Sequence, residues 1–584
     1  DKLNYPSSFT IYDTTDSKSL IKTIIKELSL DDKTYKPNQV LSRISKAKNN
    51  LITPKAYVSD PKFRELDERR KQPYLGEIYK RYASRCYRAG AMDFDDLLLN
   101  TNILFRDFPD VLKKYQDKFQ YILVDEYQDT NFAQYLIIKK LAENHHNICV
   151  VGDDAQSIYS FRGAKIENIL NFKNDYKNFK LYKLEQNYRS TQTIVQAANS
   201  VIEKNSNRIK KDVWSGNEGG DKVKVIGSMT DTEEGYVIAN DILNSRINEN
   251  SSFNDFAVLY RTNAQSRIFE DVFRKKSIPY KLYGSLSFYQ RKEIKDLLAY
   301  FRVTINPGDD EALKRIINYP VRGIGKKTVE QLVEKGEKFQ QSIWALLVEK
   351  DWNQLGLSSR AVSPLKKFKA MIEDFQNQFD QKDAYEIGTY IASETGILKT
   401  LYQDQSPEST AKYENIQEIL NGIQEFTEER LEESGEKAML GEYMENVALL
   451  TDLDKEEDDE DKDKVTLMTI HSAKGLEFKN VYLAGLEENL FPSKRSSETM
   501  EDLEEERRLF YVALTRAEKK ATLSFSQNRQ KWGNTESCQP SRFIREIDQQ
   551  FLDMSSETAR SLFPEIPQNQ METSPGRSNF EKSK

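Results

Sequence analysis

Cysteine and histidine are scarce in this chain. Its 584 residues include three cysteines and three histidines. The cysteines, Cys86, Cys149 and Cys538, lie far apart and have none of the spacings of a metal-binding or disulfide framework. This scarcity argues against a disulfide-stapled secreted domain and against a histidine-rich metal site. It favours a reducing compartment.

Long apolar runs are also missing. No stretch approaches the ~18 consecutive apolar residues that a membrane-spanning helix needs, so the sequence predicts no membrane span. Hydrophobic residues make up 38% of the chain and charged residues 31%, which is typical of a soluble, helix-rich protein. A chain of this length is expected to fold as several domains.

The chain has no excess of basic residues. Its formal net charge is −7, whereas a protein that binds nucleic-acid phosphates needs a basic face. The negative charge is uneven, because acidic residues are concentrated in residues 452–464 and 501–506. Basic residues could still line a groove elsewhere, so the net charge neither supports nor excludes binding to DNA.

The most informative stretch of the sequence is residues 121–131. A short apolar run, Tyr121 to Val124, ends in two adjacent carboxylates, Asp125 and Glu126. Such a run predicts a buried strand of a parallel sheet, and ligands of such sheets bind beyond the carboxyl ends of the strands. One carboxylate there suits Mg²⁺ bridged to phosphate oxygens, and the next suits a water that attacks a γ-phosphate. The alternative is an acidic strand end that makes a turn or caps a helix, and an Asp-Glu pair by itself leaves it open.

Two further apolar runs are followed by polar and aromatic residues in the same way. Residues 147–151 precede GDDAQSIYSFRG (152–163), and residues 179–184 precede EQNYRST (185–191). Apolar strands that alternate with helices predict a doubly wound α/β domain with a site at one edge.

A second α/β set follows, interrupted by a largely helical, charged segment from about residue 289 to 453. Its strands are predicted at residues 222–226, 255–260, 465–470, 481–484 and 521–525. Elsewhere, apolar spacing and cap residues predict helices at residues 17–28, 40–51, 63–86 and 135–143, and one that opens at residues 92–98. The residues after about 552 have little periodicity, which predicts a disordered tail.

Taken in this order, the motifs resemble motifs II to VI of superfamily 1 DNA helicases of the UvrD/PcrA/Rep type. The matching segments are DEYQDTN (125–131), GDDAQSIYSFRGA (152–164), LEQNYRST (184–191), TLMTIHSAKGLEF (466–478) and EEERRLFYVALTRAE (504–518). The resemblance continues to about residue 548 and includes YRTNAQSR (260–267) and SRFIREI (541–547).

The resemblance implies an α/β fold with two RecA-like parallel-sheet motor domains, the first incomplete, and helical inserted subdomains. The first motor domain would hold a helical subdomain, and the second would be split by the helical insertion. The implied parts are a helical subdomain (1–86), the first motor domain (87–187), the first part of the second motor domain (188–288), the inserted subdomain (289–453), the second part of the second motor domain (454–551) and a disordered tail (552–584).

Three residues of the first motor domain have roles implied by the resemblance. Asp125 resembles the Mg²⁺ ligand, and Glu126 resembles the base that activates water. Gln156 resembles the residue that contacts the γ-phosphate and couples hydrolysis to DNA. The implied cofactors are therefore ATP and Mg²⁺.

Four further residues are implied at the nucleotide. Arg189 and Arg516 resemble the two arginines that neutralise charge on the transferred phosphoryl group. Because Arg516 would come from the second motor domain, hydrolysis would depend on closure of the cleft. Tyr188 would stack on adenine, and Glu477 would accept a hydrogen bond from the ribose hydroxyl. The alternative for either arginine is a surface ion pair of small energetic value.

Aromatic residues just beyond Gln156 are candidates for stacking on single-stranded DNA. Tyr159, Phe161 and Arg162 would stack on bases without sequence preference, and close relatives often carry Trp where this chain has Phe161. The alternative is that these aromatics belong to an ordinary core. The further residues expected along the DNA are Arg261, Asn263 and His471.

Two features suggest how duplex DNA is handled. Gly323 and Gly325 form a Gly-x-Gly turn with basic neighbours, which offers backbone N–H groups to phosphate; by its spacing alone it could equally be a simple turn. Trp532 lies in the hairpin expected after residues 521–525, where relatives place an aromatic wedge at the fork.

A phosphate-binding loop is missing from the sequence. No G-x-x-x-x-G-K-[ST] motif occurs, and the chain begins at Asp1 without a signal-peptide pattern. In the family that this chain resembles, the loop precedes motif II, so the resemblance implies an N-terminally truncated chain whose phosphate loop lies upstream. These 584 residues alone are expected to hydrolyse ATP negligibly, and the first motor sheet is expected to expose apolar surface.

The leading hypothesis is an ATP-dependent DNA helicase and translocase that moves 3′ to 5′ and serves repair or replication. Its expected partners are single-stranded DNA, single-strand/duplex junctions and repair or replication proteins, in the bacterial cytoplasm near the nucleoid and away from membranes. The main alternative is a non-catalytic DNA-binding or regulatory relative that lacks the phosphate loop. A helicase–nuclease subunit is a third, although the short tail leaves no room for a nuclease domain.

Overall fold

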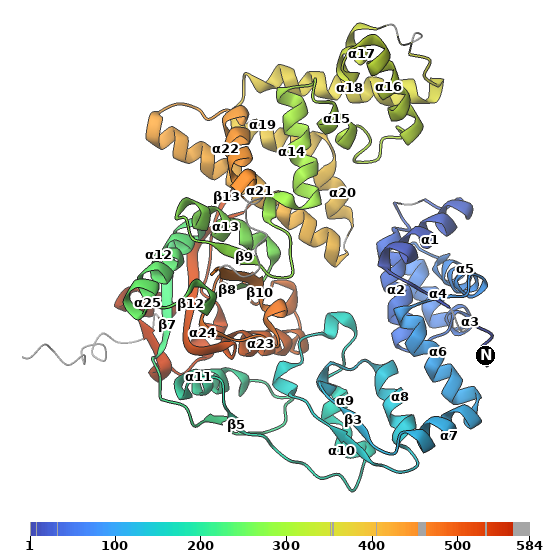
Figure 1. The fold of residues 1–584 in the computed structure, drawn as a ribbon, viewed down its shortest axis with the longest axis vertical. Helices are drawn as coiled ribbons and strands as arrows, with labels where there is room; N and C mark the ends of the chain where they lie inside the picture. Colours follow the sequence, from blue (N-terminus) through green and yellow to red (C-terminus); the bar gives the residue numbers. More distant parts are fainter. Residues whose placement is uncertain are drawn as a thin grey trace, which may run out of the picture. The chain divides into compact units, whose positions relative to one another are not determined.

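The structure is a computed structural model, and it describes residues 2–6, 9–31, 33–350, 352, 355–404, 406–453, 463–531 and 534–563. The chain divides into two compact units (Figure 1). Unit 1 comprises Asp1–Lys183, Asn207–Lys211 and Leu401–Thr410. Unit 2 comprises Leu184–Ser206, Asp212–Thr400 and Ala411–Lys584.

Unit 2 is built on an 8-stranded sheet. In spatial order its strands are β14 (Leu552–Met554), β7 (Val223–Thr230), β12 (Ala517–Lys531), β11 (Phe478–Leu483), β8 (Phe256–Tyr260), β10 (Val465–Thr469) and β9 (Tyr280–Leu282). These neighbours are all parallel, and only β13 (Asn534–Ser537) pairs antiparallel, as the hairpin partner of β12. The strands predicted in this part of the sequence are therefore confirmed.

Helices cover both faces of this sheet, which is why its strands are continuous apolar runs. On one face α12 (Asp231–Glu249) and α13 (Ser266–Lys275) pack a buried core against β8, β10 and β11. In Figure 1, α11 (Gln192–Ile202) and α23 (Met500–Leu514) lie on the other side. This is the α/β fold with a large parallel sheet that was predicted, consistent with a RecA-like helicase domain.

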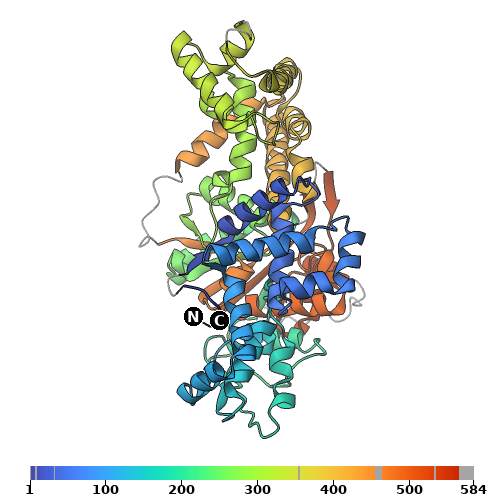
Figure 2. The same cartoon turned by 90° about the vertical axis from the view of Figure 1, so that its right-hand side faces the viewer.

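The helical insertion lies between β9 and β10. Figures 1 and 2 both show α16, α17 and α18 at the end of unit 2 farthest from the sheet. The helices of this segment are α14 (Lys292–Ile305), α15 (Asp310–Ile316), α16 (Lys326–Phe339), α17 (Ile343–Glu349), α18 (Ser359–Phe379), α19 (Ala384–Glu394), α20 (Ile397–Gln403), α21 (Pro407–Ser434) and α22 (Leu440–Leu453).

Unit 1 is mostly helical, with two small parallel sheets within the described residues. Its first helices pack a core of their own between α1, α2 and α5. The strand pairs are β1 (Thr10–Tyr12) with β2 (Ala91–Asp93), and β3 (Ile122–Val124) with β4 (Ile148–Val150). The helices are α1 (Thr14–Glu27), α2 (Pro37–Asn49), α3 (Pro54–Ser59), α4 (Pro61–Arg69), α5 (Leu75–Arg88), α6 (Phe94–Asp107), α7 (Pro109–Lys118), α8 (Phe132–Ala142), α9 (Glu167–Leu170) and α10 (Phe172–Asp175).

Helix starts follow the cap residues in the sequence. Asp13 caps α1 and Asp93 caps α6, and each forms a capping box with the acidic residue three positions on. Asn131 does the same for α8 with Gln134. The predicted helices at residues 17–28, 40–51, 92–98 and 135–143 are confirmed by α1, α2, α6 and α8.

Two predicted elements are wrong. The long helix expected at residues 63–86 is broken into α4 and α5, because Pro73 lacks the N–H that a continuous helix would need. Residues 179–184 form no strand, and their side chains at Leu181, Tyr182 and Leu184 are exposed. A strand requires a neighbour for its backbone hydrogen bonds, and none is paired with this segment.

The strand that precedes Asp125 is present but is not buried as predicted. Leu123 is 80% exposed, and Tyr121, Cys149 and Val151 are also exposed on the β3–β4 pair. This confirms the prediction that the first sheet exposes apolar surface.

The sequence predicts a disordered tail from about residue 552, but regular structure continues beyond that residue. Residues 552–554 form β14 beside β7, and α25 (Ser556–Leu562) packs against β7. Leu552 and Leu562 are buried, so this segment has apolar contacts although its sequence shows little periodicity. The remainder of the tail, residues 564–584, and the acidic residues 454–462 lie outside the described residues.

Candidate active site

The two carboxylates at the end of β3 are held in a strained turn. Glu126 has a positive φ of 50°, which a residue with a side chain adopts at a cost of about 1–3 kcal/mol and which is common at active sites. Its backbone N–H donates to Asp125 Oδ1 at 2.8 Å. Both carboxylates are exposed at the carboxyl end of the strand. The turn therefore directs two acidic groups to the edge where parallel sheets bind ligands.

Gln128 connects this turn to the end of β4. Its side chain is fully buried, and its Nε2 donates to Glu126 Oε2 at 2.6 Å. Its Oε1 accepts from the backbone N–H of Asp153 at 3.0 Å. Gly152 leaves room for this approach, because a Cβ there would overlap Gln128 Oε1 and lie 2.9 Å from Ile169 Cδ1. The ends of β3 and β4 are thus joined by one amide side chain.

Gln156 lies in the turn that follows β4. Its Nε2 donates to Asp153 Oδ2 at 2.9 Å. Asp153 in turn forms an ion pair with Lys211, whose Nζ also lies 3.1 Å from Asp154 Oδ1. Burial opposes the charge on Asp153, but Lys211 outweighs it, so the pKa of Asp153 is lowered. The structure therefore brings Glu126 and Gln156 into one connected group within unit 1.

The aromatic residues beyond Gln156 form an exposed cluster. The rings of Tyr159 and Phe161 lie 6.0 Å apart, and the Arg162 guanidinium lies 5.4 Å from each ring centroid. Phe161 is 63% exposed, so the alternative that it is a core aromatic is wrong. An exposed ring beside a cation is the arrangement on which nucleic-acid bases stack.

A second polar group forms within unit 2, just after β5 (Gln186–Asn187). Arg189 Nε donates to Glu477 Oε2 at 2.6 Å, and its Nη1 lies 3.5 Å from the Thr515 carbonyl. Glu477 precedes β11, and Thr515 precedes β12. Three segments that are remote in the sequence therefore meet at neighbouring strands.

Arg516 and Tyr188 flank this pair. Arg516 is buried, and its Nε and Nη1 donate to the Val512 and Leu476 carbonyls at 3.0 and 3.2 Å. Tyr188 is exposed, and its hydroxyl donates to Gln186 Oε1 at 3.1 Å. Arg516 is held in place by backbone carbonyls, whereas the Tyr188 ring presents a flat apolar face to solvent.

The residues predicted along the DNA gather at the carboxyl ends of β8 and β10. These strands are parallel neighbours with Tyr260 opposite Thr469, so Arg261 and His471 follow them at the same edge. Asn263 is exposed in the turn after β8. Arg261 is engaged by buried Glu506, with Nη2 to Oε1 at 2.6 Å. A phosphate would therefore compete with a carboxylate for this guanidinium.

The Gly-x-Gly turn leads directly into α16. Gly323 has φ of 82°, which favours glycine, and Gly325 is the N-cap of the helix. A Cβ at either position would meet nothing within 4 Å, so the backbone is open to solvent at a helix N-terminus, where anions are favoured. Trp532 lies outside the described residues, although the predicted hairpin is present as β12 and β13.

Three residues of the first group were not assigned roles from the sequence. Gln128 and Asp153 lie inside the quoted motifs, so their position was a usable signal. Lys211 lies outside those motifs, and nothing in its local sequence points to Asp153. Its partner is visible only in the folded chain.

Two α/β units with polar groups at their strand ends are the architecture of a RecA-like helicase motor. The chain belongs to the UvrD-like helicase family: a model of the UvrD-like helicase C-terminal domain matches residues 182–528, and a model of the UvrD/REP helicase N-terminal domain matches residues 1–177. These matches lend no support to the predicted N-terminal truncation or to a phosphate loop outside the chain.

Curated relatives match over nearly the whole chain. The ATP-dependent DNA helicase PcrA of Staphylococcus epidermidis strain RP62A is 40% identical over 568 residues, which are 97% of this chain and 76% of the relative. The protein of the same name from Bacillus subtilis strain 168 is 41% identical over 561 residues, 95% of this chain and 74% of the relative. That from Staphylococcus aureus strain Mu50 is 40% identical over 563 residues, 96% of this chain and 75% of the relative.

Two kinds of feature are absent from the described residues. None of their helices is long and apolar enough to cross a membrane. Among the same residues, no group of three or more His, Cys, Asp or Glu side chains is arranged to hold a metal ion.

Proposed function

We propose that this protein is an ATP-dependent DNA helicase and translocase that moves 3′ to 5′ on single-stranded DNA and unwinds duplex. The observation that carries the proposal is the connected group Glu126–Gln128–Asp153–Gln156 at the ends of β3 and β4. It is supported by relatives named ATP-dependent DNA helicase at about 40% identity.

The carboxylates at β3 suit ATP with Mg²⁺. Mg²⁺ in nucleotide sites takes one or two carboxylates together with phosphate oxygens and water, so it does not need a protein-only cage. Asp125, exposed at the strand end, would hold the ion, which supplies charge neutralisation at the phosphates when bound. Glu126 would orient and deprotonate the attacking water, while Gln156 would contact the γ-phosphate.

In unit 2, the side chains around Arg189 suit the parts of a nucleotide that the β3 carboxylates do not contact. Arg189 and Arg516 would neutralise phosphate charge, and Glu477 would accept from the ribose. The present Arg189–Glu477 ion pair would then exchange partners when nucleotide binds. The exposed ring of Tyr188 would stack on adenine.

Single-stranded DNA and single-strand/duplex junctions are the proposed substrates. Tyr159, Phe161 and Arg162 would stack on bases. The strand ends that carry Arg261, Asn263 and His471 would line the track, and the turn at Gly323 and Gly325 would hold duplex phosphate. We further propose that the protein acts in DNA repair or replication, near the bacterial nucleoid. Its protein partners would come from those processes.

We also propose the domain organisation predicted above: a helical subdomain before residue 87, two motor domains divided near residue 188, and a helical insertion at residues 289–453. The large sheet of unit 2 and the helical segment between β9 and β10 support this division.

A non-catalytic regulatory relative is a second candidate, favoured by one observation. The 584 residues contain no G-x-x-x-x-G-K-[ST] loop, and that loop supplies backbone N–H groups and a lysine to the phosphates. On this second reading, we propose that these 584 residues by themselves hydrolyse ATP negligibly.

The test is hydrolysis of ATP by the full-length protein, with and without single-stranded DNA. DNA should stimulate the wild type, and Glu126→Gln should lower kcat by about 100-fold or more, because general-base catalysis contributes 10²–10⁴-fold. Glu143→Gln, a change of an exposed glutamate on the same unit, is the matched control and should leave kcat unchanged. A full-length wild type that binds DNA but never hydrolyses ATP would favour the regulatory relative instead.

A further inference from the structure

Lys211 occupies a position that the motifs do not explain. Its ammonium forms ion pairs with both Asp153 and Asp154, the two aspartates that follow β4. The backbone N–H of Ile209 adds a hydrogen bond to Asp154 Oδ2 at 2.9 Å. The Lys211 side chain is only 19% exposed. The short segment Asn207–Lys211, which is remote in sequence from β4, is therefore bonded to the turn that carries Gln156.

From Asp153 the contacts run to both groups proposed to act on the γ-phosphate. Asp153 Oδ2 accepts from Gln156 Nε2 at 2.9 Å. Its Oδ1 accepts from the Ala155 N–H at 2.9 Å and so shapes the turn that presents Gln156. Its own backbone N–H donates to Gln128, whose amide then donates to Glu126. Asp153 is the junction of this chain of contacts.

The position and charge of the Asp153 carboxylate depend on a nearby cation. Asp153 and Asp154 are adjacent carboxylates in a mostly buried turn, and two like charges there repel each other unless they are paired. Burial alone would lower the pKa of Lys211, but the two aspartates outweigh it and raise that pKa. Without the ammonium, Asp153 would turn toward solvent or take up a proton, and either change would release Gln156.

We propose that Lys211 is a positioning residue for ATP hydrolysis. It fixes the Asp153 carboxylate, which holds Gln156 directly. The backbone N–H of the same aspartate bonds Gln128, which in turn holds Glu126. The proposal rests on the function proposed above, because it concerns the same site. The alternative is an ion pair that stabilises the fold without affecting the orientation of Gln156.

The first test compares three variants of the full-length protein. Lys211→Met should lower kcat for DNA-stimulated ATP hydrolysis by about 10- to 100-fold, the loss typical of residues that orient an active group from behind. The KM for ATP and the affinity for single-stranded DNA should change little. Lys211→Arg keeps the charge and should recover part of kcat. Lys210→Met, a change of the exposed neighbouring lysine, is the matched control and should behave as wild type.

The second test separates positioning from stability. If Lys211 acts through Gln156, then Lys211→Met should have little further effect on kcat in a Gln156→Ala background, because coupled residues are not additive. Additive losses, or a Lys211→Met protein with wild-type kcat, would overturn the proposal. If Lys211→Met does not fold, Lys211→Arg replaces it in the same comparison with Gln156→Ala. The partial loss of kcat that Lys211→Arg causes in the wild-type protein should then be absent when Gln156→Ala is also present.

The outcomes distinguish the two proposals. An active wild type whose Glu126→Gln variant is inactive, together with a fully active Lys211→Met, removes the role of Lys211 alone. A full-length wild type without ATP hydrolysis removes the proposed function, and the role of Lys211 with it.

Discussion

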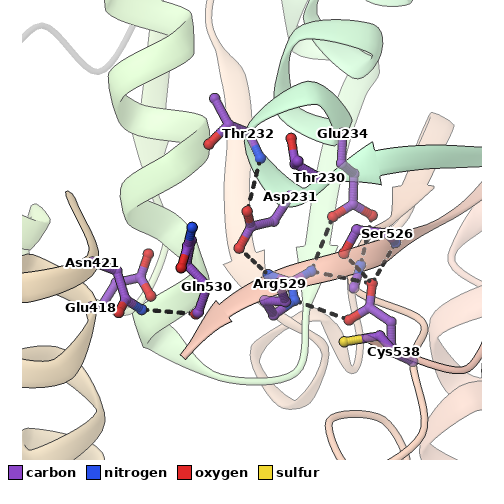
Figure 3. A network of polar contacts seen from close by, with 12 residues as sticks. Thr230, Asp231, Thr232, Glu234, Glu418, Asn421, Ser526, Arg529, Gln530 and Cys538 are labelled. Atoms are coloured by element: carbon purple, nitrogen blue, oxygen red, sulfur yellow. Dashed lines mark hydrogen bonds and ion pairs between the residues drawn. The ribbon is translucent and has the colours of Figure 1, made fainter. Parts of the chain in front are cut away.

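Arg529 offers the sharpest test of what holds unit 2 together. It lies on β12 just before the hairpin turn and is surrounded by three carboxylates (Figure 3). Its guanidinium lies 3.3 Å from Asp231, 3.2 Å from Glu234 and 3.1 Å from Glu487. All four side chains are buried. We predict that Arg529→Met strongly destabilises the protein, because it leaves three acidic groups without their cation.

The size of the effect follows from the burial of these groups. Removing one partner of a buried ion pair costs about 3–5 kcal/mol, since the remaining charge is uncompensated. Burial, followed by the nearby Glu487, already raises the pKa of Glu234 from 4.5 to about 7 in the presence of Arg529. Burial likewise raises that of Asp231 to about 6. Without the arginine both pKa values should rise further.

The loss should therefore depend on pH. A carboxyl group whose pKa is higher in the folded than in the unfolded state contributes stability at low pH, and this contribution is lost as the pH rises through the folded-state pKa. For Glu234 that window runs from 4.5 to about 7 in the wild type, and in the variant it extends to higher pH. The difference in the free energy of unfolding between wild type and Arg529→Met should therefore be larger at pH 8 than at pH 5. It grows by about 1.4 kcal/mol for each unit by which the pKa in the variant exceeds the wild-type pKa.

The assay is thermal unfolding of both proteins at pH 5, 7 and 8. Arg430→Met is the matched control, because Arg430 pairs with Glu442 at 3.6 Å with both side chains more than 40% exposed; such pairs are worth about 1 kcal/mol or less. Equal midpoints for Arg529→Met and Arg430→Met at pH 8 would refute the reasoning. The reasoning would also be refuted if the difference in unfolding midpoint between Arg529→Met and wild type became smaller as the pH rises.

Two further predictions concern the proposed site. Gly152→Ala should lower kcat for ATP hydrolysis by about 10-fold or more, because its Cβ would overlap Gln128 and disturb the contact with Glu126; Gly219→Ala, where a Cβ meets nothing within 4 Å, is the control. Trp532→Ala should reduce unwinding of a forked duplex far more than DNA-stimulated ATP hydrolysis, because a fork wedge acts only on base pairs. Equal loss of both activities would rule out the wedge, and wild-type kcat in Gly152→Ala would contradict the role of Gln128.

Local signals in the sequence predicted the parts of the fold that depend on local physics. The apolar runs at residues 222–226 and 255–260 became β7 and β8, and Asp13 and Asp93 cap the helices that follow them. Strand periodicity and helix caps act over a few residues, so they can be read without knowledge of the fold.

Errors arose where the outcome depends on a distant neighbour. Residues 179–184 have a strand-like pattern but no partner strand, and β3 was expected to be buried yet exposes Leu123. The sequence predicts a disordered tail from about residue 552, yet residues 552–554 pair with the edge of β7. Sheet pairing and burial are properties of the whole fold, so a short sequence window does not contain them.

The same division applies to the candidate site. The sequence alone determined which residues stand at the strand ends, including Asp125, Glu126 and Arg189, because they follow apolar runs within recognisable motifs. Only the tertiary structure decided their partners. Glu126 is connected to Gln156 through Gln128 and Asp153, Arg189 pairs with Glu477, and Lys211 pairs with the turn after β4. The physical reason is that an ion pair or hydrogen bond is set by distance in space, and these partners lie on segments that no short window of the sequence contains together.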